Sequence, residues 1–437
     1  MIVNRQIPKL VYNKIQELNY KHKEHLYVIC DMIIRVGSIR RNHNEYYDFI
    51  DIPKNNFRSI LTDDTAYYNG LEVLINNNII ECDEIYSKDG GKAKGYRFNK
   101  DLISLLIKVE LTKKTLSGKI IKNRNKRYIE TPKDLIKSRD YFYNNFNLDY
   151  DKAIEWVNNW FNDELYYLNT NYNLYLCGGK IQNEYDKEFK TLTIKNCYYI
   201  SQIENIRDRE LYFNRNKTNN RLDTNLTNLK GELKKFITIP NLTQIDLSNS
   251  QPYILYLTIL NYYYTYVAGI SKTNTNNIIE INKEELEMYG EWVSSGQYYE
   301  NFMNYKFPPH KYSININNLD RNLIKDIMFK VFYSHNDLYP ELKDIFKSIF
   351  PTIYNWIYEY KKENYKSLSI KMQKIESEMC IDIISQELDK LNINYLTIHD
   401  AWLVDNNDIP KVKEIIESKF KEKYNNIPHL KTEKITN

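Results

Sequence analysis

Two aspartates in apolar surroundings and one basic, aromatic helix hold the residues of this sequence that could perform chemistry. Asp246 ends one apolar run, and Asp400 interrupts another. Between them, one segment carries a cationic or aromatic residue at every fourth position: Arg321, Lys325, Phe329 and Tyr333. Carboxylates bind divalent cations through oxygen, and cationic side chains bind phosphate. Together these residue types suit phosphoryl transfer assisted by two metal ions.

The two aspartates are expected at the ends of β-strands. Residues 242–246 have the apolar character of a strand, and a helix is expected from Gln251 onward. Residues 394–405 predict a β-hairpin whose tight turn holds His399 and Asp400. A turn aspartate that faces a strand-end aspartate can hold Mg²⁺, with water and phosphate as the remaining ligands. Taken singly, either aspartate could equally be a helix cap or a turn former.

The segment 321–333 predicts one helix with two different faces. At about 100° per residue, residues spaced by four drift by about 40° per step and stay within one third of the circumference. The opposite side is apolar and predicts a buried back formed by Leu323, Ile324, Ile327 and Val331. Such a helix can present cations to a triphosphate and rings to base and sugar. An ordinary amphipathic helix with one solvated face has the same spacing, so the spacing alone leaves both interpretations open.

The first 105 residues are expected to form a separate winged-helix-like domain that binds DNA. Its expected helices are 28–36 and 57–77, and its expected strands are 79–80, 85–86 and 96–98. In such a domain the helix before the hairpin enters the major groove, and the hairpin lysines meet phosphate: Lys88, Lys92 and Lys94. Small helix-hairpin modules also serve as protein adaptors, and that alternative stays open.

Residues 106–200 are expected to form a linker followed by a helical region. The run 113–127 is basic and poor in apolar residues, which predicts a solvated connector. Residues 132–170 have a helical pattern, with Trp156 and Trp160 four residues apart and expected in the core. From about residue 199 strands and helices alternate, so residues 201–437 are expected to form an α+β domain.

Composition sets wide limits on the function. The chain has 61 Lys and Arg against 57 Asp and Glu, a net charge of +4, so any surface for a polyanion must be local. The five cysteines are scattered without a C-x-x-C pair, which argues against a zinc site or a disulfide framework. Neither a signal peptide nor a membrane span is expected, because the most apolar stretch, 253–270, is interrupted by polar residues. We therefore expect a cytoplasmic location.

In these segments the chain resembles the family A DNA polymerases and their relatives, the single-subunit phage-type RNA polymerases. The segment around Asp246 is similar to the first catalytic-aspartate motif, and Asp400, with the histidine before it, is similar to the second. The residues spaced by four are similar to the fingers-helix motif, and the three motifs occur in the family's order. Two weaker similarities lie at Arg221 and Gln373. The resemblance covers about residues 200–410.

The resemblance implies a right-hand polymerase fold with an antiparallel palm sheet, helical fingers and a reduced thumb. It implies that Asp246 and Asp400 bind two Mg²⁺ ions, or Mn²⁺, and that Lys325 donates a proton to the leaving pyrophosphate. The residues implied to hold the incoming nucleotide are Arg321, Lys325, Phe329, Tyr333 and Gln251. Those implied to contact template or primer are Arg221, Gln373 and His399. The expected partners are a DNA template, a primer and nucleoside triphosphates, with no membrane.

Several positions depart from the pattern of the DNA polymerases in this family. Gln251 stands where they usually carry Glu, which helps to exclude a 2′-hydroxyl. Ser334 stands where Gly is common, and Ala401 follows Asp400 where they carry Glu. Phe329 leans the other way, because the RNA polymerases usually have Met there. These departures leave the choice between dNTP and rNTP open.

The sequence therefore predicts a template-directed nucleotidyltransferase, a small DNA-dependent DNA polymerase of a virus or mobile element without a proofreading exonuclease. A primase or RNA polymerase on the same scaffold is the nearest alternative. A non-catalytic winged-helix replication initiator with a relic palm is another, and the presence of both aspartates argues against it. A glycosidase or nuclease with paired carboxylates would leave the pattern of 321–333 unexplained.

Overall fold

In the computed structural model the chain divides into two compact units, and each is described by itself. Unit 1 comprises Met1–Thr131, Asn145–Phe213 and Thr224–Ile239, and unit 2 comprises Pro132–Asn144, Asn214–Asp223 and Pro240–Asn437. The residues that the structure describes are 3–39, 49–61, 64–87, 92–129, 135–173, 179–267, 279–304 and 320–436. Among the helices in these ranges, none combines the length and apolar composition needed to cross a bilayer.

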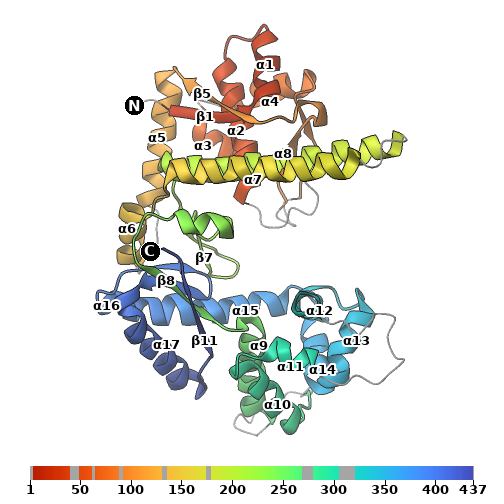
Figure 1. The fold of residues 1–437 in the computed structure, drawn as a ribbon, viewed down its shortest axis with the longest axis vertical. Helices are drawn as coiled ribbons and strands as arrows, with labels where there is room; N and C mark the ends of the chain where they lie inside the picture. Colours follow the sequence, from red (N-terminus) through yellow and green to blue (C-terminus); the bar gives the residue numbers. More distant parts are fainter. Residues whose placement is uncertain are drawn as a thin grey trace. The chain divides into compact units, whose positions relative to one another are not determined.

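The N-terminal part of unit 1 consists of helices and short strands, and the strands form two small antiparallel sheets (Figure 1). One sheet has three strands in the order β2-β4-β3, and the other pairs β1 with β5 from Val3↔Leu111 to Pro8↔Leu106. The elements are β1 (Val3–Pro8), α1 (Lys9–Glu17), α2 (Lys23–Ile39), β2 (Ile50–Asp51), α3 (Lys54–Ile60), α4 (Asp64–Asn76), β3 (Ile80–Cys82), β4 (Gly95–Phe98) and β5 (Leu106–Leu111).

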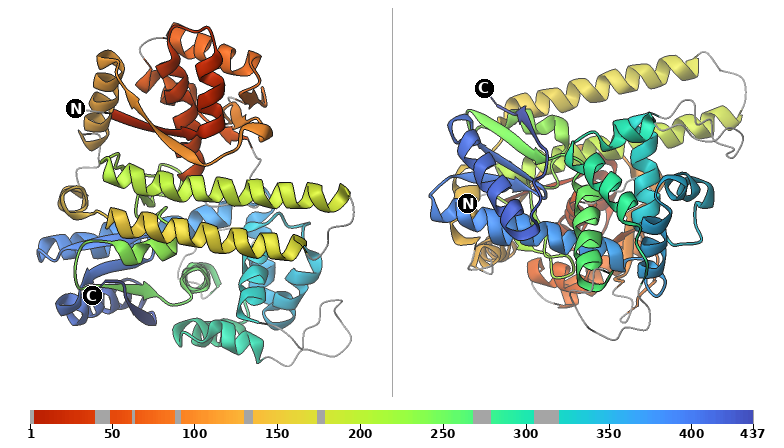
Figure 2. Two further views of the ribbon diagram at one scale, coloured as in Figure 1. Left: turned by 45° about the horizontal axis from the view of Figure 1, so that its top comes forward. Right: turned by 90° about the horizontal axis from the view of Figure 1, so that it is seen from below.

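Helix α2 forms the centre of this part of unit 1. Its sequence is apolar around most of its circumference, and such a helix has to be covered on several sides. It packs against β1, α4 and α8 (Gly179–Arg207), and Leu26, Ile29 and Ile33 are fully buried. Helix α8 lies beside α7 (Tyr150–Asn173), and Figure 2 shows the two long helices running next to each other. The apolar residues of α2 thus organise the core of unit 1.

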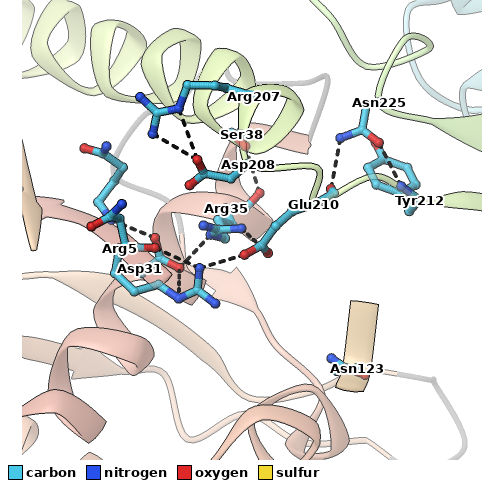
Figure 3. Close-up of polar contacts among 12 residues, drawn as sticks. Arg5, Asp31, Arg35, Ser38, Asn123, Arg207, Asp208, Glu210, Tyr212 and Asn225 are labelled. Atoms are coloured by element: carbon cyan, nitrogen blue, oxygen red, sulfur yellow. Dashed lines mark hydrogen bonds and ion pairs between the residues drawn. The ribbon is translucent and has the colours of Figure 1, made fainter. Parts of the chain in front are cut away.

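A buried ionic cluster joins β1, α2 and the segment after α8 (Figure 3). Arg35 forms an ion pair with Asp31, with Nε and Oδ2 2.6 Å apart, and Glu210 accepts a hydrogen bond from Arg5 at 2.7 Å. Arg35 also pairs with Glu210, and the Nε of Arg5 lies 3.4 Å from Asp31. Burial raises the pKa of Asp31, while Arg35 and Arg5 oppose that rise. Two cations and two anions balance each other, as buried charges must.

Three local predictions for the N-terminal half are wrong in detail. The expected helix 57–77 is two helices, α3 and α4. Ile85 and Tyr86 are exposed and lie outside any strand, so β3 pairs directly with β4. The run 113–127 belongs to helix α5 (Lys114–Ile129), not to a solvated connector, because Leu116 and Ile120 are buried on one side of it. The basic residues of that run do not prevent helix formation, since Lys and Arg have good helix propensity.

Unit 2 contains a four-stranded antiparallel sheet in the order β11-β8-β10-β9. Its strands are β8 (Leu242–Leu247), β9 (Tyr395–Ile398), β10 (Ala401–Asp405) and β11 (Leu430–Lys434). The expected strand at 242–246 and the expected hairpin at 394–405 are therefore confirmed. A π-helical segment, Glu378–Ser385, holds the hairpin: the hydroxyl of Tyr395 donates to the Ser385 carbonyl at 3.1 Å, and Trp402 Nε1 donates to Ser385 Oγ at 3.2 Å.

Helices make up the rest of unit 2. In chain order they are α6 (Ile136–Asn145), α9 (Ser250–Tyr262), α10 (Lys283–Ser294), α11 (Tyr298–Met303), α12 (Arg321–Tyr333), α13 (Pro340–Ile349), α14 (Pro351–Lys361), α15 (Ser367–Ser377), α16 (Gln386–Lys390) and α17 (Ile409–Tyr424). The segment Asn214–Asp223 of unit 2 holds most of a short hairpin formed by β6 (Phe213–Arg215) and β7 (Leu222–Thr224). Mixed helices and small antiparallel sheets confirm the α+β class.

Candidate functional site

The two aspartates lie at the same end of neighbouring strands in unit 2. Asp246 is the Cα partner of Ala401 in the β8–β10 ladder. The N–H of Leu247 donates to the carbonyl of Asp400 at 3.2 Å, which continues the ladder into the hairpin turn. Antiparallel pairing therefore brings together two residues that are more than 150 positions apart in the chain.

Sharp turns follow β8 and precede β10. Asn249 and His399 both have left-handed backbones, with φ of 53° and 55°. Such conformations are uncommon for residues other than glycine, and they turn the chain abruptly beside each aspartate. The turn after Asp246 is also held by His429: its carbonyl accepts from the N–H of Ser248 at 2.9 Å, and its Nδ1 lies 2.8 Å from Ser248 Oγ. The backbone around both aspartates is thus set by specific contacts.

Helix α12 begins and ends at the residues that the sequence predicts. Asp320 caps its start, with Oδ1 accepting from the N–H of Leu323 at 2.7 Å. Its buried residues are Ile324, Ile327, Met328, Val331 and Phe332. The predicted back of the helix is therefore buried, except that Leu323 is only partly so. Phe329 lies on the opposite side and is 55% exposed.

One pocket of unit 2 is lined by seven of the residues that the sequence singles out. These are Asp246, Asp400, Arg321, Lys325, Phe329, Tyr333 and Gln251. The pocket is open to solvent, and its empty volume of about 750 Å³ includes part of that solvent space. Tyr299 from α11 and Lys431 from β11 also line it, and the sequence predicted neither. The structure therefore brings both carboxylates and one face of α12 to the same cavity.

The pocket has acidic and basic sides. Lys431 is the strand partner of Asp246 in the β8–β11 ladder, so the two side chains share one face of the sheet. Burial, with Arg321 and Lys431 nearby, lowers the pKa of Lys325, and Asp246 opposes that shift. The guanidinium of Arg321 lies 4.9 Å from the ring centre of Tyr299, a cation–π contact that orients it. Three cations and two carboxylates thus face a volume that can hold a phosphorylated ligand.

A buried hydrogen-bond network extends from this pocket to α15. Glu376 on α15 accepts from Arg221 Nη2 at 2.7 Å and from Gln251 Nε2 at 2.5 Å. The hydroxyl of Tyr333 donates to Gln251 Oε1 at 2.5 Å. Burial, reinforced by Asp400, raises the pKa of Glu376 to about 7, although Arg221 opposes the rise. Glu376 is completely buried, and the sequence did not predict it, because an acid in a segment that also holds Lys371 and Lys374 has no distinguishing signal.

The other predicted nucleic-acid contacts are placed differently. Arg221 forms the ion pair with Glu376, and Gln373 Oε1 accepts from Asn219 at 3.0 Å, so neither side chain is among those lining the pocket. In unit 1, Lys92 lies 3.3 Å from Asp83, and Lys94 pairs with Glu84. Lys88 lies outside the described residues. The two described hairpin lysines are therefore partly neutralised by neighbouring acids.

The residues in the pocket fit a Mg²⁺ site in which the protein supplies only some of the ligands and the substrate supplies others. Within the described ranges, no group of three or more His, Cys, Asp or Glu side chains could enclose a metal by itself. Mg²⁺ is commonly held by one or two carboxylates, with waters and substrate phosphates completing an octahedron. Asp246 and Asp400 supply that number of carboxylates, and Arg321 and Lys325 of α12 line the same pocket.

No family model matches the sequence, and no curated protein matches it. Among solved structures, the chain is similar to the POL domain of Pol1 from M. smegmatis, in a structure that also contains a DNA primer-template and dNTP. The identity is 9%, the match covers 73% of each chain, and the TM-score is 0.42.

Proposed function

We propose that this protein is a template-directed nucleotidyltransferase, a DNA polymerase of the family A kind. The observation that carries the proposal is the pocket of unit 2, which is lined by both aspartates and by the four residues spaced along α12. A two-metal phosphoryl-transfer site requires carboxylates for the ions and fixed cations for the phosphates. The glycosidase alternative would use the carboxylates but would have no need of Arg321 and Lys325.

In this proposal Asp246 and Asp400 hold two Mg²⁺ ions, or Mn²⁺. Bound there, the ions would activate the primer hydroxyl and neutralise charge on the reacting phosphate. Arg321 and Lys325 bind the triphosphate. Because its pKa is lowered, Lys325 gives up a proton more readily than an ordinary lysine, which suits a donor to the leaving pyrophosphate. The pocket thus supplies an acid for the leaving pyrophosphate, and the proton of the primer hydroxyl, made acidic by the ions, would pass to water.

The remaining roles follow the length of α12. Its rise of about 1.5 Å per residue separates Arg321 from Tyr333 by about 18 Å, so cations and rings meet different parts of one nucleotide. Phe329, Tyr333 and Gln251 would pack on base and sugar. The proposed contacts to template or primer are Arg221, Gln373 and His399. The sheet β11-β8-β10-β9 would be the palm, and helices α9 to α14 the fingers.

We further propose that the N-terminal part of unit 1 is a winged helix that positions the enzyme on DNA. Its element order, α2-β2-α3-α4-β3-β4, with a three-stranded antiparallel sheet, supports this. Helix α4 would enter the major groove, and Lys88, Lys92 and Lys94 would meet phosphate. A virus or mobile element is the source that we propose, and residues 106–200 would supply a reduced thumb.

Primer extension tests the proposal directly. With Mg²⁺ and dNTPs, the wild-type protein should extend a primed template, and Asp400→Asn should reduce incorporation by about 10³-fold or more. Asp408→Asn is the matched control, because Asp408 lies beyond the other end of β10 and does not line the pocket. Duplex binding should be retained in both variants. Unchanged incorporation by Asp400→Asn would rule out the two-metal assignment.

A primase or RNA polymerase on the same fold is the second candidate. Two features of the site favour it: Gln251 is uncharged, and Ala401 stands beside Asp246 without adding an acid. Preference for rNTPs, together with initiation on an unprimed template, would support this candidate. Duplex binding without incorporation of either nucleotide set would instead favour a non-catalytic replication initiator.

A further inference from the structure

Glu376 is a buried acid that touches the pocket only through other residues. It is fully buried, and its Oε2 accepts both hydrogen bonds that the network directs to it, one from Arg221 and one from Gln251. Its Oε1 is buried and has no hydrogen-bond partner among the described residues. A buried carboxylate is costly unless cations and donors surround it, so its retention here calls for an explanation.

The acid determines which way the Gln251 amide points. A carboxylate can only accept hydrogen bonds, whereas an amide has one donating end and one accepting end. With Nε2 directed to Glu376, Oε1 is left to accept from the hydroxyl of Tyr333. The reversed amide would set its oxygen against the carboxylate oxygen at 2.5 Å, which is repulsive. The orientation of Gln251 and the position of the Tyr333 hydroxyl therefore depend on the acid at 376.

We propose that Glu376 is a positioning residue that sets the choice between deoxyribose and ribose in the incoming nucleotide. This inference rests on the proposed function. Gln251 follows Asp246 by five residues and lines the same pocket, beside the phosphate that would be attacked. Tyr333 lies at the end of α12 away from the triphosphate-binding cations. Gln251 and Tyr333 therefore border the sugar, and Glu376 fixes the donors and acceptors that they show to it.

A second ion pair nearby provides a control that distinguishes the proposed positioning role of Glu376 from a contribution to the stability of the fold alone. Arg215 forms two hydrogen bonds to Asp382, at 2.7 and 2.8 Å. This pair joins the segment 214–223 to the π-helical segment that continues from α15, and the pair of Arg221 and Glu376 joins the same segment to α15 itself. None of these four residues lines the pocket, but only Glu376 is bonded to a residue that does. Asp382→Asn is therefore the matched control for Glu376→Gln.

The measurement is single-nucleotide primer extension at pH 8 with Mg²⁺, giving kcat/KM for a dNTP and for the matching rNTP. Glu376→Gln should change the ratio of the two values by about tenfold or more, because the amide at 251 no longer has a fixed orientation. Asp382→Asn should keep the wild-type ratio. Gln251→Glu alone should lower both values, because it sets two carboxylates against each other in a buried place.

The double exchange Gln251→Glu with Glu376→Gln is the decisive variant. It recreates the bond with the roles reversed, since the amide introduced at 376 can donate to the acid introduced at 251. Tyr333 can still donate to that acid. We expect kcat/KM for the dNTP to return to within about threefold of the wild type, because the bond between residues 251 and 376 is restored. This variant also decides the matter if Glu376→Gln alone does not fold, because its buried donors and acceptors are balanced.

The possible failures can be told apart. A wild-type protein that incorporates neither nucleotide refutes the proposed function, and the inference falls with it. If the wild type incorporates nucleotides normally but Glu376→Gln lowers both kcat/KM values equally and keeps their ratio, the inference about Glu376 is refuted and the proposed function stands. An exchange variant that folds but keeps the lowered kcat/KM of Gln251→Glu refutes it as well.

Discussion

Replacing Lys361 by methionine is expected to change how the stability of unit 2 depends on pH. Lys361 ends α14, is 2% exposed, and donates from Nζ to the carbonyl of Val331 at 2.7 Å, near the end of α12. A second buried lysine, Lys343, donates to the carbonyl of Asn336 at 3.1 Å. Burial, with Lys343 nearby, lowers the pKa of Lys361 to about 7. Lys361 thus supports the pocket helix while carrying a charge that burial disfavours.

The sign and size of the pH dependence follow from the number of protons that Lys361 binds in the folded and in the unfolded state. In the unfolded chain a lysine keeps its proton to about pH 10.4, whereas folded Lys361 releases it near pH 7. Between these values the unfolded state binds one more proton, so the unfolding free energy rises with pH by about 1.4 kcal/mol per unit. From pH 7.5 to 9 this contribution amounts to about 2 kcal/mol. Methionine has no proton to lose, and the contribution disappears.

Urea unfolding at several pH values between 6 and 9, followed by tryptophan fluorescence, measures this slope. Lys361→Met should be less stable than the wild type at pH 9, because the Val331 carbonyl loses its donor, at about 1–3 kcal/mol. The difference should shrink toward pH 6, where the wild type must bury an ammonium. Lys362→Met is the control, because Lys362 is 64% exposed. Equal pH slopes for Lys361→Met and the wild type would refute this account of Lys361.

Two further predictions concern cations at the proposed binding surfaces. Lys431→Ala should raise the pKa of Lys325, because Lys431 lowers it. The alkaline limb of the pH profile for incorporation should then move to higher pH. An unmoved limb would contradict the assignment of Lys325 as the proton donor. Replacing Lys92 and Lys94 together by glutamine should weaken duplex binding and reduce the salt slope by about one per lost phosphate contact. The same double change should leave incorporation on a saturating primer-template unaltered, and an unchanged salt slope would remove these lysines from the DNA surface.

Local patterns in the sequence were sufficient to predict helix α12 and the hairpin β9–β10, which carry several of the residues that line the pocket. Helix α12 was predicted with its two ends and its buried side because a spacing of four residues is a property of one helix and depends on nothing distant. The hairpin β9–β10 was predicted for a similar reason, since two short apolar runs flank its turn. Each of these signals lies within about a dozen residues of chain.

The parts that could not be predicted depend on distant partners. Nothing near Glu376 in the sequence shows that Arg221 and Gln251 meet it, because both come from other segments. The same applies to the hairpin lysines: Lys94 was expected to be free for phosphate, and it pairs with Glu84. The type of a charged residue shows which interactions its side chain can form. The partner that it finds depends on how distant segments of the chain pack against it.

Strand register connects the core of unit 2 to the chemistry of its pocket. Along β8, Ile245 and Leu247 are fully buried, while Gln244 and Asp246, which alternate with them, are only partly buried. Because side chains alternate along a strand, a shift of one residue would bury Asp246 in the core and turn its apolar neighbours to the pocket. The hydrophobic cost of that shift keeps the carboxylate on the pocket side. The same register sets Ala401 and Lys431 on either side of Asp246, so burial of the apolar face specifies the arrangement of the polar one.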